Sequence, residues 1–258
     1  MSSVNILSGG AAHGLVGSLA SAFKAQTGFE IAGEFGAVGV MADKLRKGTP
    51  ADIIVLTAAL VAKLAEEKLV VTTSIADVGL VETALAVRTG DPQAAVRDAA
   101  GLREALLASD AIFVPDTKAS TAGIHVANVL DRLGIADEIA SRLRIFPNGA
   151  TAMRELAASE ARRPIGCTQS TEIISTKGVI LSGSLPPGCE LATMYTAGIT
   201  SAATRSRQAQ SHRPADRCRT TRTAETRRLH QQPGLGANVA LQLLDEPSEA
   251  HSPRPPRS

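Results

Sequence analysis

Two helix starts between Asp116 and Ile173 constrain the fold of this chain more than any other feature. In the first, Ser120-Thr121-Ala122-Gly123 precedes an apolar helical period that Gly134 closes, which is an N-cap followed by a helix and a glycine stop. In the second, Pro147-Asn148-Gly149-Ala150 precedes another helical period. Small residues leave first-turn N–H groups uncovered, and these groups with the helix dipole favour an anion. Ordinary capped helices that bind nothing remain the simpler interpretation of either start alone.

The rest of the chain to about residue 200 alternates short apolar runs with helical periods. Apolar runs at 4–7, 29–35 and 53–56 are each followed by a helical period, and the last run is typical of a strand buried on both faces. This alternation predicts an α/β fold with parallel strands and right-handed crossovers. Ligands of such sheets lie beyond the carboxyl ends of the strands, where the small-residue loops 8–12 and 36–39 are expected.

We expect two lobes, each a mixed sheet flanked by helices, with a ligand cleft between them. The first lobe covers about 1–80 and is completed by about 186–200, and the second covers 81–185. A β-prone run at 80–87 is expected to cross between the lobes. A helix-rich stretch is expected at 92–109, and further strands at 111–115, 165–167, 179–185 and 191–199.

Charge and aromatic content separate residues 201–258 from the rest. Residues 1–200 hold 17 basic and 20 acidic residues, whereas the last 58 hold 10 arginines, no lysine, 5 acidic residues and six of the 13 prolines. With 2% aromatic residues and no Trp, stacking on nucleobases is not favoured, so we expect no nucleic-acid partner. The tail is expected to be disordered and basic.

The sequence contains no clear pattern for disulfide bonds, a metal site or an N-terminal targeting segment. Three cysteines give no even disulfide framework and no CxxC pattern, so we expect no metal and no cofactor. No basic and apolar leader is visible at the N-terminus and no apolar run is long enough to span a membrane, which predicts a cytoplasmic chain. A periplasmic location is expected instead if a signal was removed.

Six segments resemble, in order, the molybdate-binding branch of the type II periplasmic binding proteins. They are ADIIVLT, VGLVETALAV, STAGIHVANVLDRLGI, FPNGATAMRELAASE, RPIGCTQSTEI and LPPGCELATMYTAGI, and the match covers about residues 4–200. The resemblance implies two α/β lobes joined by crossing strands that close by a hinge on an oxyanion. It also implies a monomer that delivers a small anion to an ABC transporter permease.

The resemblance also implies a ligand site built from four loops and the second-lobe strand end. The ligand-binding residues carried over are Ser8, Gly9, Gly10, Ala11, Gly36, Ala37, Val38, Gly39, Ser120, Thr121, Ala122, Gly123, Asn148, Gly149, Ala150 and Gln169. Three positions depart from the family's hydroxyl donors: Ala11 replaces a serine, 36–39 replaces a serine-rich loop, and Gln169 lies at or near a tyrosine position. Losing several donors, each contributing about 1 kcal/mol or more, predicts at least ~100-fold weaker molybdate binding.

Two other functions remain open from the sequence. An isomerase of a small unsaturated carboxylic acid needs acid–base groups, for which His13, His125 and Glu172 are the candidates, and aconitate isomerase is similar to the same family. A packing role for His125 and a core role for Cys167 are the simpler interpretations. A ligand-sensing interaction protein is the third possibility.

The resemblance stops within a few residues of Thr200. A domain of this type should continue with amphipathic helices, but here Arg and Pro replace the apolar period. We therefore interpret residues 201–258 as the product of a frameshift near 200–210, with a genuine disordered extension as the alternative.

Overall fold

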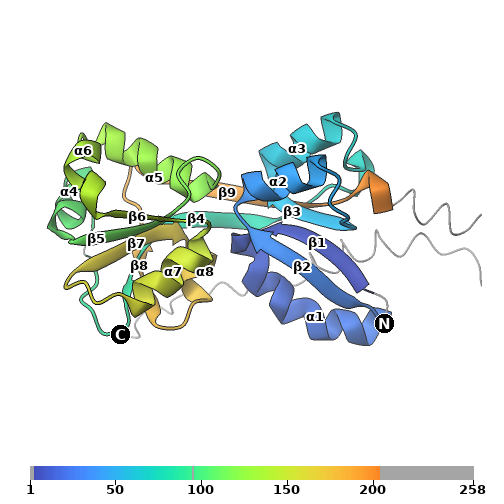
Figure 1. Cartoon of the computed structure of the whole chain (residues 1–258), viewed down its shortest axis with the longest axis horizontal. Helices are drawn as coiled ribbons and strands as arrows, with labels where there is room; N and C mark the ends of the chain where they lie inside the picture. Colours follow the sequence, from blue (N-terminus) through green and yellow to red (C-terminus); the bar gives the residue numbers. More distant parts are fainter. Residues whose placement is uncertain (1–2, 95, 204–258) are drawn as a thin grey trace, which may run out of the picture.

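The computed structural model describes residues 3–94 and 96–203, and the expectations for residues 204–258 lie outside this part. Within it, nine strands form one curled sheet in the order β2-β1-β3-β9-β4-β7-β5-β6, with β8 paired to β4. The sheet has two halves, each covered by helices, that meet along β4 and β9 (Figure 1). The predicted α/β class is therefore confirmed.

The first half consists of three parallel strands with helices on both faces. Its strands are β1 (Ser3–Gly9), β2 (Glu30–Gly36) and β3 (Ile53–Thr57). Its helices are α1 (His13–Thr27), α2 (Val38–Arg46) and α3 (Ala58–Glu66), with short 3-10 turns η1 (Gly10–Ala12) and η2 (Thr72–Ser74). Every residue of β3 is buried, as its apolar run predicts.

The second half repeats the arrangement with β5 at its centre. Its strands are β5 (Ala111–Pro115), β6 (Leu143–Phe146), β7 (Pro164–Gln169) and β8 (Val179–Ser184). One face carries α4 (Ala99–Ala108), α5 (Thr121–Arg132), α6 (Ala136–Ile139) and η3 (Ala140–Arg142), and the other carries α7 (Gly149–Ala158) and α8 (Ser170–Ile174). Strands β6 and β7 both run parallel to β5.

Two antiparallel strands, β4 (Ala76–Arg88) and β9 (Ala192–Ile199), connect the halves. Residues 76–82 of β4 pair with β9, and residues 83–88 pair with β7 and β8. We retain the expected lobe boundary near residue 81 as a proposal, since β4 changes partners at this point.

Local signals predicted most element ends well. Gly28, Gly48 and Gly134 end helices with positive φ, as their positions in the sequence predict. The stretch 92–109, expected to be rich in helix, contains one helix in its described residues: α4 begins at Ala99, after Asp98, whose side chain accepts a hydrogen bond from the Gly101 N–H at 2.8 Å. Asp98 is the N-cap, and the preceding segment with Pro92 is irregular.

Two glycines in helices should respond oppositely to alanine. In Gly123→Ala the new Cβ would point onto the carbonyl oxygens of Pro115 and Asp116, so we expect about 1–3 kcal/mol of destabilisation. In the control Gly17→Ala the Cβ meets nothing, and we expect a gain of about 0.5–1 kcal/mol because alanine favours the helix. Urea denaturation measures both changes. Equal shifts for the two variants would contradict the tight packing at Gly123.

Candidate functional site

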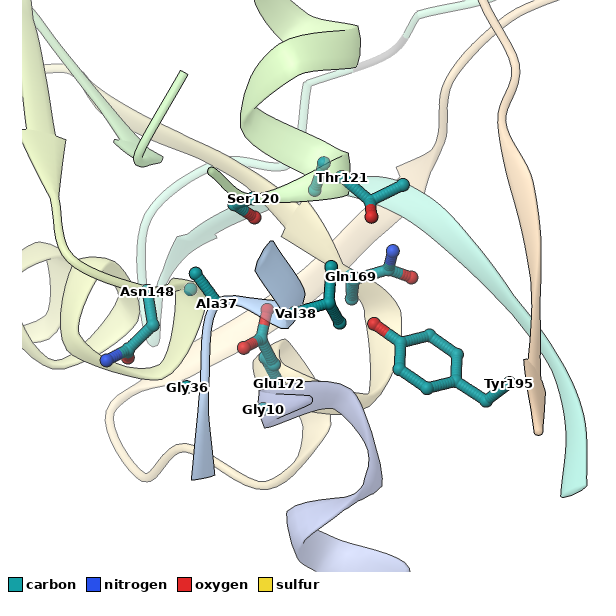
Figure 2. Close-up of a pocket in the computed structure, with 12 residues that line it drawn as sticks. Gly10, Gly36, Ala37, Val38, Ser120, Thr121, Asn148, Gln169, Glu172 and Tyr195 are labelled. Atoms are coloured by element: carbon teal, nitrogen blue, oxygen red, sulfur yellow. The ribbon is translucent and has the colours of Figure 1, made fainter. Parts of the chain in front are cut away.

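One cleft lies where the two halves of the sheet meet, and it is lined by residues from both halves (Figure 2). The cavity is small, about 10 Å³, and part of it is open to solvent. The lining residues are Gly10, Gly36, Ala37, Val38, Ser120, Thr121, Ala122, Asn148, Gly149, Gln169, Glu172 and Tyr195. All four small-residue loops of the sequence therefore reach the same cleft.

The first half contributes η1 and the start of α2. Gly10 lies in η1, and Gly36, Ala37 and Val38 lead from β2 into α2. The Gly39 N–H donates a hydrogen bond to the Ala119 carbonyl at 3.2 Å. This bond crosses from the α2 start to the α5 start, so the cleft is closed at this side.

The second half contributes the N-termini of α5 and α7. Ser120 is the N-cap residue of α5, but its side chain makes no capping hydrogen bond, which leaves the first-turn N–H groups of this helix uncovered by it. In α7 the Asn148 side chain accepts from the Thr151 N–H at 2.9 Å. Both helix dipoles present positive ends to the cleft.

A buried carboxylate, Glu172 of α8, is the most unusual group in the cleft. Its side chain is 5% exposed, and the Thr168 hydroxyl donates to Oε2 at 2.6 Å. Burial raises the pKa of Glu172, while hydrogen bonds from Thr168 and from the backbone N–H groups of Ala150, Gln169 and Gly149 act to lower it. The α7 N-terminus thus already faces a carboxyl group of the protein itself.

Gln169 and Tyr195 complete the lining. Gln169, at the end of β7, is 2% exposed, and neither its amide nitrogen nor its amide oxygen has a hydrogen-bond partner. Tyr195 lies on β9, and its hydroxyl points into the cleft on the same side as Glu172 (Figure 2). Burial, and secondarily the Glu172 charge, raise the pKa of Tyr195, which keeps its hydroxyl protonated as a donor.

Several expected site residues lie beside the cleft but do not line it. Ser8 is fully buried, and its hydroxyl donates to the Gly9 carbonyl at 3.0 Å. Gly9 lies against Tyr195 and Val38, and Ala11 is part of the hydrophobic core. Gly123 packs on the preceding loop, and the Ala150 N–H group donates a hydrogen bond to the Glu172 carboxyl.

Neither candidate histidine lines the cleft. The His13 ring is at the surface and packs edge-on to Phe35, with 4.6 Å between ring centroids. The His125 Nε2 lies 2.8 Å from the Cys189 carbonyl oxygen, a contact within the second half. Cys167 is a buried core residue whose thiol pKa burial raises to about 12. Of the three acid–base candidates, only Glu172 is in the cleft.

Sequence reasoning missed Tyr195 as a site residue and gave Glu172 only a catalytic role. Tyr195 is the single tyrosine of the chain and lies on a strand expected to return to the first lobe, which was an available signal. Among the described residues lining the cleft none is Lys, Arg or His. In residues 3–94 and 96–203, no group of three or more His, Cys, Asp or Glu side chains is placed to hold a metal ion.

Known structures share this fold. The periplasmic molybdate-binding protein of Azotobacter vinelandii superposes with a TM-score of 0.64 at 18% identity, covering 81% of this chain and 90% of that one. The sulfate-binding protein SubI of Mycobacterium tuberculosis gives 0.60 at 18% identity, covering 81% and 82%. The fold is therefore that of the two-lobed periplasmic binding proteins.

The sequence matches a known protein family along most of its length. The profile of the bacterial extracellular solute-binding proteins matches residues 4–212, so the chain belongs to this family. Among curated proteins it is similar to an aconitate isomerase of Pseudomonas sp., with 23% identity over 212 residues, 78% of this chain and 77% of that protein. Helices in the described part are too short or too polar to cross a bilayer.

The raised pKa of Glu172 makes stability depend on pH. The native state binds more protons than the unfolded state between the usual value of 4.5 and the native pKa, so stability falls as pH rises through this window, by at most about 1.4 kcal/mol per pH unit for this one proton. The amide of Glu172→Gln has no proton to lose in this range. We expect the variant to gain stability relative to the wild type as pH rises above 4.5, measured by urea denaturation from pH 4 to 8.

Glu155→Gln is the matched control, because Glu155 is an exposed carboxylate on α7. Its difference from the wild type should change little over the same range. A constant difference between Glu172→Gln and the wild type at every pH would contradict the raised pKa.

Proposed function

We propose that the protein binds a small anion in the cleft between its two lobes. The observation that carries the proposal is the convergence of the α5 and α7 N-termini, the α2 start and the Tyr195 hydroxyl on one space. N–H groups and hydroxyls in a closed cleft stabilise an anion through charge-assisted hydrogen bonds, each contributing roughly 1.5–3 kcal/mol. The molybdate-binding and sulfate-binding proteins that share the fold support an oxyanion or a small organic acid.

Family membership extends the proposal to transport. An extracellular solute-binding protein acts outside the cytoplasm, which favours the periplasmic alternative over the cytoplasmic location expected from the N-terminus. We include an ABC transporter permease as the partner in this proposal. Closure would be a hinge motion about β4 and β9, and opening would break the bond between Gly39 and Ala119.

A charge at the α5 start tests the site. Thr121→Asp places a carboxylate at the first helical residue, where the dipole favours it for stability but where it repels an anion in the cleft. Two like charges about 4 Å apart at an effective dielectric of 20 repel by about 4 kcal/mol, so we expect at least ~100-fold weaker binding.

The assay is calorimetry and thermal shift with molybdate, tungstate, sulfate, citrate and both aconitates. Ala100→Asp is the control, because it adds the same charge to the first turn of α4, at an exposed position away from the cleft. Stabilisation by no anion of the panel, or unchanged binding in Thr121→Asp, would contradict the proposed site.

An isomerase is the second candidate, favoured by the similarity to aconitate isomerase and by the buried Glu172 carboxylate. Burial raises the pKa of Glu172, which makes this carboxyl group a better proton acceptor than an exposed glutamate. If this function holds, the purified protein interconverts cis- and trans-aconitate without added metal or cofactor, as followed by NMR.

Of the three acid–base candidates, Glu172 is the one expected to be needed for that activity, because it lines the cleft. Glu172→Gln should abolish turnover, whereas His13→Ala and His125→Ala should retain it because neither ring lines the cleft. Measurable binding of aconitate with no interconversion from pH 5 to 9 would rule out the isomerase and leave the binding function.

A further inference from the structure

The cleft holds a buried carboxyl group, that of Glu172, but no basic side chain among the described residues that line it. Glu172 and Tyr195 are the ionisable groups among the described lining residues. The elements packed against α8 also carry His13 on α1, Arg154 and Glu155 on α7, and charged residues on β4, and none of these side chains lines the cleft. An incoming anion therefore meets helix dipoles and a carboxylate, without a cation to balance that carboxylate.

The Glu172 carboxylate is fitted into its position by both lobes. A Cβ added to Gly10, in the first lobe, would overlap Oε1, and a Cβ added to Gly149, in the second, would overlap Oε2 and the Thr168 hydroxyl. The Thr168 hydroxyl bond to Oε2, at 2.6 Å, fixes the orientation of the carboxylate. Two glycines and a buried hydroxyl thus hold an acceptor group at the junction of the lobes.

Gln169 supplies the second, independent observation. Its amide is buried, lines the cleft, and has neither a donor nor an acceptor partner. Buried amides are normally paired, so both atoms await groups that the protein does not provide. The oxygen needs a donor, and a fully deprotonated oxyanion offers acceptors alone.

We propose that the ligand of this cleft is a small anion that carries its own O–H donor, with the Glu172 carboxylate as the acceptor of that hydrogen. The inference rests on the proposed anion binding and names the ligand class. The anionic oxygens face the α5 N–H groups and the Tyr195 hydroxyl. The O–H lies between Glu172 and the Gln169 amide oxygen, and these two acceptors share its one hydrogen. Hydrogen-bearing inorganic oxyanions and small hydroxy acids share this chemistry.

Two matched pairs of ligands test the effect of the O–H group on binding while charge and size stay nearly constant. At pH 8, hydrogen phosphate and sulfate are both tetrahedral dianions that differ by one proton, and glycolate and propionate differ by a hydroxyl in place of a methyl group. Calorimetry on the full chain should show at least ~100-fold tighter binding of the hydroxylated member in one pair, because the other member leaves buried acceptors unpaired. A preference for hydrogen phosphate over sulfate indicates an inorganic ligand, and a preference for glycolate over propionate indicates an organic one.

Glu172→Gln should reduce this preference at least tenfold, because the amide adds a donor and removes the charge, whereas Glu155→Gln should keep it. Circular dichroism confirms that both variants fold. Equal binding of the two members in every pair that binds would overturn the inference while leaving anion binding intact. Retention of the full preference in Glu172→Gln would overturn the role of Glu172. Binding of no anion at all would overturn the proposed function and this inference together.

Discussion

The antiparallel pair of β4 and β9 connects the two halves of the sheet and holds Tyr195 and Gln169 at the cleft. In β9, Tyr195 pairs with Thr57 of β3 on one side and Gly79 of β4 on the other, so its ring is held at the edge of the first lobe. Further along β4, Thr83 pairs with Gln169 at the end of β7. Strand pairing can shift only by whole residues. A shift of one residue would turn the side chains of Tyr195 and Gln169 to the opposite face of the sheet, away from the cleft. The site therefore depends on the pairing of strands that are far apart in the sequence.

The elements could be predicted because their signals are short-range. The buried run 53–56 became β3, and Gly28, Gly48 and Gly134 ended their helices, since apolar period and positive φ are properties of a few neighbouring residues. Asn148 acts as a cap, as its place before a helical period indicates. The convergence of the four loops followed from the rule that parallel strands present their carboxyl ends at one edge.

The identity of the cleft side chains could not be predicted in the same way, because it depends on long-range packing. Ala11 lies only one residue from Gly10, yet it turns into the core. His125 lies in the same helix as Thr121, one turn further on. At that position its ring contacts the Cys189 carbonyl oxygen of the second half instead of the cleft. Tyr195 was assigned to a structural strand, although it supplies a hydroxyl that the Gln169 position lacks. The tyrosine comes from another strand, which local comparison of motifs does not reveal.

The glycines of the cleft have a different role from the one their sequence suggests. Next to a helix start, a glycine indicates a bare N–H group that awaits a ligand. In the structure, Gly10 and Gly149 instead clear space for the protein's own carboxylate. The first N–H groups of α7 are therefore bonded to Glu172, whereas the α5 start keeps its N–H groups free of the Ser120 side chain. A cleft with one occupied and one free helix end stabilises less negative charge than a cleft with two free ends. Burying a carboxyl group costs folding free energy, and the proposed hydrogen bond from the ligand O–H to Glu172 gives this costly group a role in binding.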